Sequence, residues 1–226
     1  MFDQILAQAP RFFTYYNMVF LLKGAGITLL LTVLGCVVGF IFGFMIAAVR
    51  STKATSLLPF RILVTVYVEI FRRIPFLVTL FIIMFAIQVI SRDISLFTIA
   101  VLSICMLSTA FLSEIIRAGM ESVPQQQVEA AETLNFGFWR TQLRVILPQS
   151  WKVIIPPAFA FMVMFIKDTS LASQMGVIEL TFTGKSLMNR GFSPFLVYGA
   201  ILLGYFIMSY PLARLGAHME KRFATS

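Results

Sequence analysis

Charged residues are scarce in this sequence: Asp, Glu, Lys and Arg make up 12% of its 226 residues, whereas 59% are hydrophobic. The mean hydropathy of +0.89 is too high for a water-soluble globular protein. Histidine occurs once, at His218 in a polar tail, and the two cysteines, Cys36 and Cys105, lie inside apolar stretches. Such a sequence offers no disulfide framework, metal cluster, cofactor ligand set or nucleophile-and-base pair. We therefore expect a membrane protein without cofactor or catalytic chemistry of its own.

Long uncharged stretches recur between short charged clusters. A bilayer core about 30 Å thick needs roughly 20 apolar residues per helical span, so this pattern predicts an all-α integral membrane protein with five transmembrane helices in one domain, residues 1–226. Pro75 removes a backbone donor within the second span, which we expect to be kinked there. The predicted spans are about 24–49, 57–91, 94–116, 153–175 and 191–213, and the polar segment 117–152 forms a loop.

Three groups of Lys and Arg fall on one face of this five-span topology. They are Arg50, Lys53 and Arg61, then Arg140, Arg144 and Lys152, and finally Arg214, Lys221 and Arg222. Short cytoplasmic loops are enriched in Lys and Arg, so we expect the N-terminus outside and the C-terminus and the loop 117–152 inside. The net charge of +8 is spread between apolar stretches, which favours contact with anionic lipid over nucleic acid.

Several charges lie inside the predicted spans, where an ionised group is costly unless it is paired or faces water. Glu69 stands three and four residues before Arg72 and Arg73, and Glu114 stands three before Arg117. Both spacings allow ion pairs within one helix. These residues are therefore either structural pairs or part of a substrate path.

The fourth predicted span has an unusually short uncharged part, residues 153–166, which is roughly 20 Å long at 1.5 Å per residue. Asp168 should therefore lie at membrane depth, and no basic residue stands three or four positions from it. We expect Asp168 either to pair with Arg72 or Arg73 of the second span, or to line an aqueous path in which Thr169 and Ser170 supply neutral hydrogen bonds.

The loop 117–152 predicts two short helices joined by a tight turn. The Glu-Ala-Ala run at 129–131 has good helix propensity, and a second amphipathic stretch, residues 138–147, precedes Pro148. Between them, Asn135 and Gly137 offer left-handed turn conformations. Physical chemistry alone leaves two roles open: the hairpin lies on the membrane through its aromatic residues, or it docks onto another protein.

The segment EAAETLNFGFWRTQLRVILP resembles the cytoplasmic signature of importer permeases of the ATP-binding-cassette (ABC) superfamily, which runs Glu-Ala-Ala, three residues, Gly, nine residues, Ile-x-Leu-Pro. Asn135 replaces the glycine and Val145 the isoleucine, and Asn is expected to keep the left-handed turn. The segments YVEIFRRIPFLV, SEIIRAGMESVPQQQVEAA and IKDTSLASQMGVIEL resemble the polar amino-acid branch, except that Gln126 replaces a glycine usual there. The residues that this resemblance assigns to ATPase coupling are Glu129, Ala130, Ala131, Asn135, Gly137, Leu147 and Pro148.

The resemblance implies a transporter permease subunit rather than an enzyme, placed in the bacterial cytoplasmic membrane and moving a polar amino acid by alternating access. It also implies a second permease, identical or related, cytoplasmic ATPase subunits that hydrolyse ATP, and an extracytoplasmic amino-acid-binding protein. The rival hypothesis, a passive channel or secondary transporter, requires no docking hairpin. The substrate path expected from the charges and this resemblance comprises Glu69, Arg72, Glu114, Asp168, Thr169 and Ser170.

Overall fold

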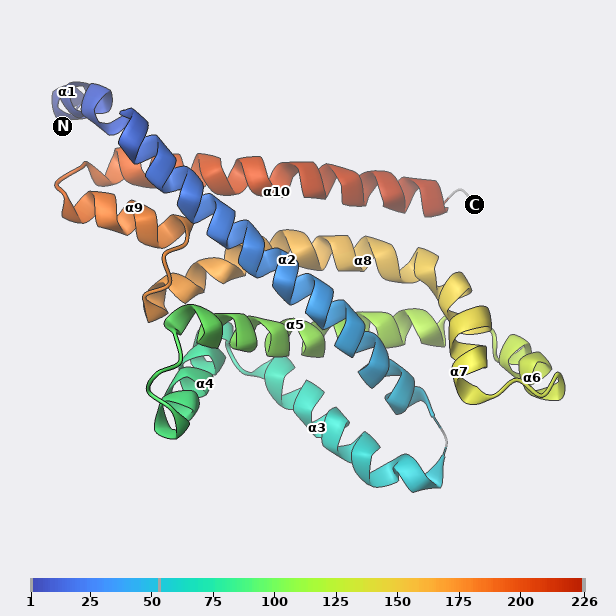
Figure 1. The fold of residues 1–226 in the computed structure, drawn as a ribbon. Coiled ribbons are helices and arrows are strands. Elements are labelled where there is room, and N and C mark those ends of the chain that lie inside the picture. Colours follow the sequence, from blue (N-terminus) through green and yellow to red (C-terminus); the bar gives the residue numbers. More distant parts are fainter. Residues whose placement is uncertain (1, 53, 225–226) are drawn as a thin grey trace. The chain divides into compact units, whose positions relative to one another are not determined.

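The computed structural model describes residues 2–52 and 54–224, and every regular element within them is helical. The helices are α1 (Phe2–Phe12), α2 (Tyr15–Ser51), α3 (Leu58–Arg73), α4 (Phe76–Ile90), α5 (Leu96–Glu121), α6 (Gln125–Thr133), α7 (Phe138–Thr141), α8 (Leu147–Asp168), α9 (Leu180–Asn189) and α10 (Pro194–Ala224) (Figure 1). Two 3₁₀-helices, Thr55–Leu57 and Thr169–Met175, and a π-helical turn, Gln142–Ile146, complete the chain. Lys53, one of the residues used to predict orientation, lies outside the described residues.

Four helical stretches are long and apolar enough to cross a membrane: Tyr15–Ser51, Leu96–Glu121, Phe138–Met175 and Pro194–Phe223. The pair α3 and α4 supplies a fifth if the two helices together form one span. The all-α membrane fold predicted from the sequence is therefore confirmed. Several helices extend past the predicted limits: α2 begins at Tyr15, α5 ends at Glu121 and α10 ends at Ala224, because a membrane helix continues past the charged residues that bound its apolar stretch. In contrast, α5 and α10 begin at Leu96 and Pro194, inside the predicted limits.

The second predicted span breaks sharply instead of kinking. α3 ends at Arg73 and α4 begins at Phe76, and the two helices are bent by 120°. Ile74 adopts an extended backbone with ψ of 138°, as expected for a residue before proline. Pro75 was therefore the correct place for the irregularity, but the expected kink was too mild.

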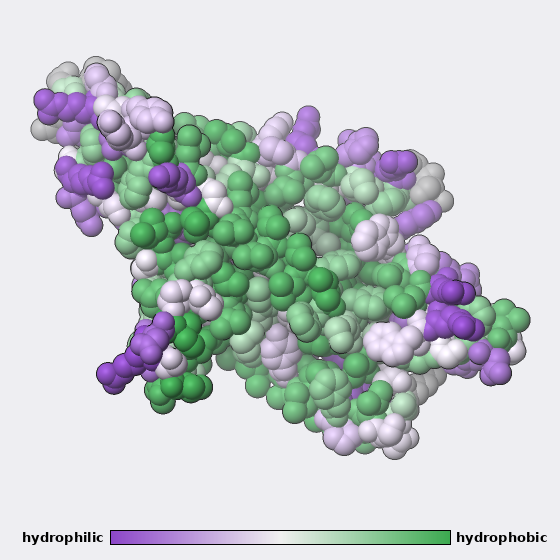
Figure 2. Space-filling model, in the orientation of Figure 1, coloured by the Kyte–Doolittle hydropathy of each residue, from purple (hydrophilic) through white to green (hydrophobic). Residues whose placement is uncertain are grey.

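Large hydrophobic side chains remain exposed along the long helices. Val33, Val37 and Ile41 of α2 are 52–55% exposed, and Leu202 and Phe206 of α10 are 66% and 56% exposed. Figure 2 shows hydrophobic side chains over much of the visible helix surface and hydrophilic ones near helix ends. This distribution suits helices that are solvated by lipid rather than by water.

The chain divides into two compact units, and the first comprises Met1–Leu34, Pro75–Ile104 and Val163–Leu212. Its cores join α1, α2, α9 and α10 through a cluster that includes Phe12, Leu187 and Ile201, and α4 and α5 through one that includes Leu80. The helix α9 lies between the fourth and fifth predicted spans. Its N-cap is Glu179, whose carboxylate accepts a hydrogen bond from the Phe182 N–H.

The second unit comprises Gly35–Ile74, Cys105–Met162 and Ala213–Ser226. Within it α2 and α5 approach closely, because a Cβ added to Gly39 would lie 2.6 Å from Ser108 Oγ and one added to Gly43 would lie 2.9 Å from the backbone nitrogen of Ser113. Ser108 Oγ also donates a 2.6 Å hydrogen bond to the Gly35 carbonyl. The spacing of these glycines in sequence is typical of such helix packing.

Candidate functional site

The turn between α6 and α7 is a helix C-cap built on Asn135. Asn135 has φ of 61°, and its N–H donates to the Glu132 carbonyl while the Phe136 N–H donates to the Ala131 carbonyl. This pair of bonds is the Schellman motif, which requires a left-handed residue where Asn135 stands. The turn predicted for Asn135 is therefore confirmed. The same prediction for Gly137 is wrong, because Gly137 has an extended backbone with φ of −70° and serves as the N-cap of α7.

The hairpin formed by α6, the turn and α7 presents only part of its signature outward. Glu129 and Ala130 are exposed, whereas Ala131 is only 4% exposed and packs inside its own chain. Leu134 and Trp139 are 71% and 50% exposed, which leaves an apolar surface beside the two outward residues. The exposed part of the hairpin can thus contact either a partner protein or lipid headgroups.

The chain stays helical from α7 into α8, so the prediction that the second stretch ends before Pro148 is wrong. The five residues between the two helices form a π-helical turn, and Leu147 and Pro148 are the first residues of α8. A wider turn relieves the clash between a proline ring and the carbonyl four residues earlier. Gln149 Nε2 donates a 2.8 Å hydrogen bond to the Val145 carbonyl, which further stabilises this passage.

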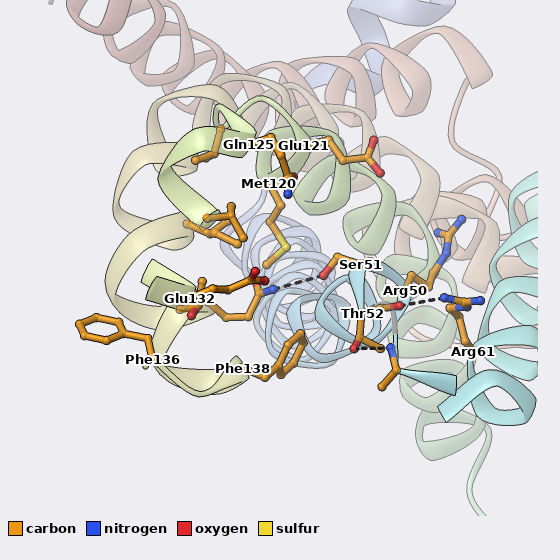
Figure 3. Close-up of a pocket in the computed structure, with 16 residues that line it drawn as sticks. Arg50, Ser51, Thr52, Arg61, Met120, Glu121, Gln125, Glu132, Phe136 and Phe138 are labelled. Atoms are coloured by element: carbon orange, nitrogen blue, oxygen red, sulfur yellow. Dashed lines mark hydrogen bonds between the residues drawn. The ribbon is translucent and has the colours of Figure 1, made fainter. Parts of the chain in front are cut away.

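A cavity of about 650 Å³ is lined by residues of the hairpin, of the ends of α2 and α5 and of the segment that joins α2 to α3 (Figure 3). On one side, Arg61 Nη1 donates to the Thr52 carbonyl at 2.8 Å. On the other, Gln142 is buried and donates from Nε2 to Ser51 Oγ at 3.3 Å. The Gln142 Oε1 atom has no hydrogen-bond partner among the described residues.

A cluster of charges surrounds Glu114 of α5. Its carboxylate accepts hydrogen bonds from Arg117 in the same helix and from Arg50 at the end of α2, the latter at 2.8 Å, and Arg72 Nη1 lies 3.6 Å away. Two predicted path residues, Arg72 and Glu114, are thus brought together beside a cavity of about 290 Å³. Glu69 is not part of the cluster, because it pairs with Arg73 one turn along α3 at 2.7 Å.

Asp168, Thr169 and Ser170 lie where α8 turns into the following 3₁₀-helix. Asp168 is half-buried, and among the described residues of its own unit no Lys or Arg side chain forms an ion pair with it. Thr169 is fully buried and donates its hydroxyl to the Ile166 carbonyl at 2.7 Å. Arg72 and Arg73, the partners considered for Asp168, are paired with Glu114 and Glu69.

Sequence reasoning missed Glu179, which is fully buried in the first unit. Its Oε2 accepts hydrogen bonds from Tyr205 at 2.8 Å and Thr28 at 3.3 Å, and these contacts tie α2 and α10 to the start of α9. Burial raises the pKa of Glu179, while hydrogen bonds from Tyr205, Thr28 and nearby backbone N–H groups lower it. Glutamate is not a favoured N-cap residue, so the local sequence gave little sign of this network.

Comparison with known proteins identifies the family. The model of the family described as "binding-protein-dependent transport system inner membrane component" matches residues 39–224. The L-cystine transport system permease protein TcyB of Bacillus subtilis is 36% identical over 196 residues, which cover 86% of this chain and 82% of that protein. The glutamine transport system permease protein GlnP of Escherichia coli (strain K12) is 30% identical, with 89% and 92% covered.

Solved structures agree with this assignment. One chain from the crystal structure of an amino acid ABC transporter with histidines has a TM-score of 0.80 at 28% identity, with 92% of this chain and 98% of that chain covered. A chain of the inward-facing MetNI methionine ABC transporter has a TM-score of 0.77 at 19% identity, with 93% and 99% covered, which supports the fold alone. The family description and the relatives' names denote transport components rather than enzymes. The chain is thus a multi-pass membrane component of a transporter and belongs to the family of binding-protein-dependent transport system inner membrane components.

Proposed function

We propose that this chain is the permease subunit of an ABC importer that moves a polar amino acid across a bacterial cytoplasmic membrane by alternating access. Relatives that match it over most of their length are named for L-cystine and glutamine transport, which supports a polar amino acid as substrate. The family description, a binding-protein-dependent inner membrane component, supports the membrane and an extracytoplasmic binding protein as a partner. Cytoplasmic ATPase subunits and a second permease, identical or related, complete the proposed importer.

The α6–α7 hairpin is the part of the chain that we propose to dock onto the ATPase. Its outward residues, Glu129 and Ala130, belong to the Glu-Ala-Ala signature, and the Asn135 cap fixes the direction in which α6 projects. In this proposal α6 enters a groove of the ATPase, where Glu129 bonds to backbone amides or a basic side chain. Closure of the ATPase pair then tilts the spans and exposes the path to each side in turn.

Gly137, Leu147 and Pro148 take supporting roles in the same proposal. Gly137 starts α7, and Leu147 and Pro148 start α8 directly after the π-helical turn. Because α7 continues into α8, a displacement of the hairpin is passed to a membrane-spanning helix without an intervening loop. Ala131 contributes by its small size inside the hairpin rather than at the docking surface.

The substrate path is proposed along the charged and polar residues of the broken second span, of α5 and of the end of α8. Arg72 and Glu114 offer one charge of each sign beside a cavity, which suits the carboxylate and ammonium groups of an amino acid. For the other unit we propose separately that Asp168 and Ser170, both half-buried, contact the substrate, and that Thr169 stabilises their turn through its bond to the Ile166 carbonyl. Glu69, at the exposed pair with Arg73, would lie at the edge of the path.

The substitution Ala130→Asp tests the coupling proposal. A charged and larger side chain at this exposed position should leave insertion intact but abolish substrate-stimulated ATP hydrolysis in vesicles that contain the permease, its ATPase and the binding protein. Ala130→Ser, which adds one oxygen without charge, is the matched control and should retain stimulation. Normal stimulation in Ala130→Asp would contradict docking and favour a hairpin that lies on the membrane.

A further inference from the structure

Three arginines of the second unit line a cavity of about 380 Å³ beside the start of α3. Arg50 is the penultimate residue of α2, Arg61 lies in the first turn of α3, and Arg117 lies in the last turns of α5. One carboxylate, that of Glu121, also lines the cavity and pairs with Arg117. The cavity therefore gathers positive charge from three separate helices.

The arginines are only partly neutralised by the protein. The three arginines of the cavity and the neighbouring Arg72 supply four positive charges. The carboxylates beside them, those of Glu114 and Glu121, supply two negative charges, which leaves an excess of two positive charges. Among residues 2–52 and 54–224, Arg50 makes one hydrogen bond, to Glu114, and Arg61 makes one, to the Thr52 carbonyl. A guanidinium has five N–H donors, so both side chains retain donors for a further acceptor. The Arg50 side chain is only 11% exposed, and an anion in this cavity would compensate its burial.

The remaining wall of the cavity is apolar and open. Leu58, Ile62 and Val66 follow one another at four-residue spacing on α3 and line the same cavity as the arginines. They are 38%, 56% and 50% exposed. Residues four apart lie in a row along a helix, so this row leads from the arginines along α3. An occupant with an anionic group and a hydrocarbon chain would satisfy both walls at once.

The position of the cavity at the ends of the spans restricts which molecules could occupy it. The cavity adjoins the C-terminal ends of two helices that are long and apolar enough to cross a membrane, Tyr15–Ser51 and Leu96–Glu121. Span ends lie at the level of lipid headgroups, where Arg side chains meet phosphate. The distribution of basic residues predicts that this end faces the cytoplasm, whose leaflet carries anionic lipid.

We propose that this cavity binds an anionic phospholipid of the phosphatidylglycerol type. Its phosphate accepts hydrogen bonds from Arg50 and Arg61, with Arg117 adding positive charge, and one acyl chain lies along Leu58, Ile62 and Val66. The excess of positive charge disfavours phosphatidylcholine, whose headgroup has no net charge. The lipid would join α2, α3 and α5 at the same cluster that holds Glu114.

Native mass spectrometry of the delipidated complex, purified with the subunits that accompany it, tests this site. Titration with phosphatidylglycerol and phosphatidylcholine of identical chains should give one tight site per permease, with phosphatidylglycerol bound about tenfold more tightly. Arg61→Gln should remove most of this preference, and Arg61→Lys, which keeps the charge, should retain much of it. Arg92→Gln removes the same charge from an exposed residue of the other unit and should leave binding unchanged. Equal binding of the two lipids, or equal effects of Arg61→Gln and Arg92→Gln, would overturn the proposal.

A second set of binding measurements tests whether the ligand of this cavity is a lipid or a simple anion. Ile62→Ser should weaken binding of long-chain phosphatidylglycerol severalfold, because the exposed row on α3 contacts the acyl chain. Millimolar inorganic phosphate should leave the lipid bound. Complete displacement by phosphate, together with wild-type binding in Ile62→Ser, would show an anion site and contradict a lipid site. The Ile62 variant retains all the arginines, so it also gives a result if Arg61→Gln fails to fold.

Discussion

Glu114 Oε2 lies 2.8 Å from Nη1 of Arg50, a residue 64 positions earlier in the chain. Glu114→Gln would leave Arg50, Arg72 and Arg117 around a neutral amide, with side chains that are 11–36% exposed. Removing one partner of a largely buried charge cluster costs about 3 kcal/mol. We expect a lower yield and a lower thermal midpoint, measured by size-exclusion chromatography after heating.

Glu69→Gln is the matched control for this prediction. Glu69 and Arg73 form a pair on one helix with side chains 42% and 78% exposed, and such exposed pairs contribute about 0–1 kcal/mol. The control should therefore keep a midpoint close to that of the wild type. Equal midpoints for the two variants would show that the Glu114 cluster does not stabilise the fold.

Asn135 should be replaceable by glycine but not by alanine. Its φ of 61° costs an alanine about 1 kcal/mol, whereas glycine adopts this conformation freely. Asn135→Ala should lower substrate-stimulated ATP hydrolysis by loosening the hairpin, and Asn135→Gly should match the wild type. Asn189→Ala, at a helical position in α9, controls for the loss of an amide. If Asn135→Ala couples normally, the direction of α6 is not what the turn controls.

The substitution Asp168→Asn distinguishes two roles of Asp168, contact with the substrate and a structural ion pair. If Asp168 contacts substrate, transport should fall at least tenfold while complex yield and basal ATP hydrolysis remain, because only a passing ammonium group loses its partner. Asp93→Asn, an exposed aspartate of the same unit, should change neither quantity. Loss of yield in Asp168→Asn would indicate a structural ion pair. Normal transport with normal yield would contradict both roles.

Tyr205→Phe should make stability more dependent on pH. Burial raises the pKa of Glu179 and the Tyr205 hydroxyl opposes that rise, so its removal should raise this pKa further. A carboxyl group whose pKa is raised on folding stabilises the protonated protein, and this contribution is lost as pH rises through the folded pKa. The deficit in thermal midpoint relative to the wild type should thus be larger at pH 8 than at pH 5. Tyr198→Phe, at a half-exposed position of α10, is the control, and an equal deficit at both pH values would contradict the prediction.

The features predicted from sequence are those that depend on local chemistry. The left-handed turn at Asn135, the ion pair between Glu69 and Arg73 and the break at Pro75 each follow from neighbouring residues. The sharpness of that break could not be predicted, because a proline frees backbone groups without fixing where the next helix runs. The continuous helix through Pro148 was missed because a π-helical turn has no clear sequence signal.

Contacts between residues far apart in the chain could not be predicted from the sequence either. Arg50 appeared in the sequence only as a basic residue after a span, and Glu179 only as an isolated acid, yet each is bound by side chains from other helices. The burial of Ala131 beside the exposed Ala130 depends on how α6 is rotated about its axis. A helix of nine residues with weak amphipathicity does not fix that rotation from its sequence.

The close approach at Gly39 has a consequence for how this helix can change over evolutionary time. Any side chain at position 39 would collide with Ser108, and Ser108 is itself held by the Gly35 carbonyl. Val33, Val37 and Ile41 on the same helix are half-exposed and can exchange with other hydrophobic residues at little cost. In descendants of this chain we therefore expect frequent substitutions between hydrophobic residues on the lipid-facing side of α2. At positions 39 and 108, a larger residue at one should be accepted only together with a smaller residue at the other.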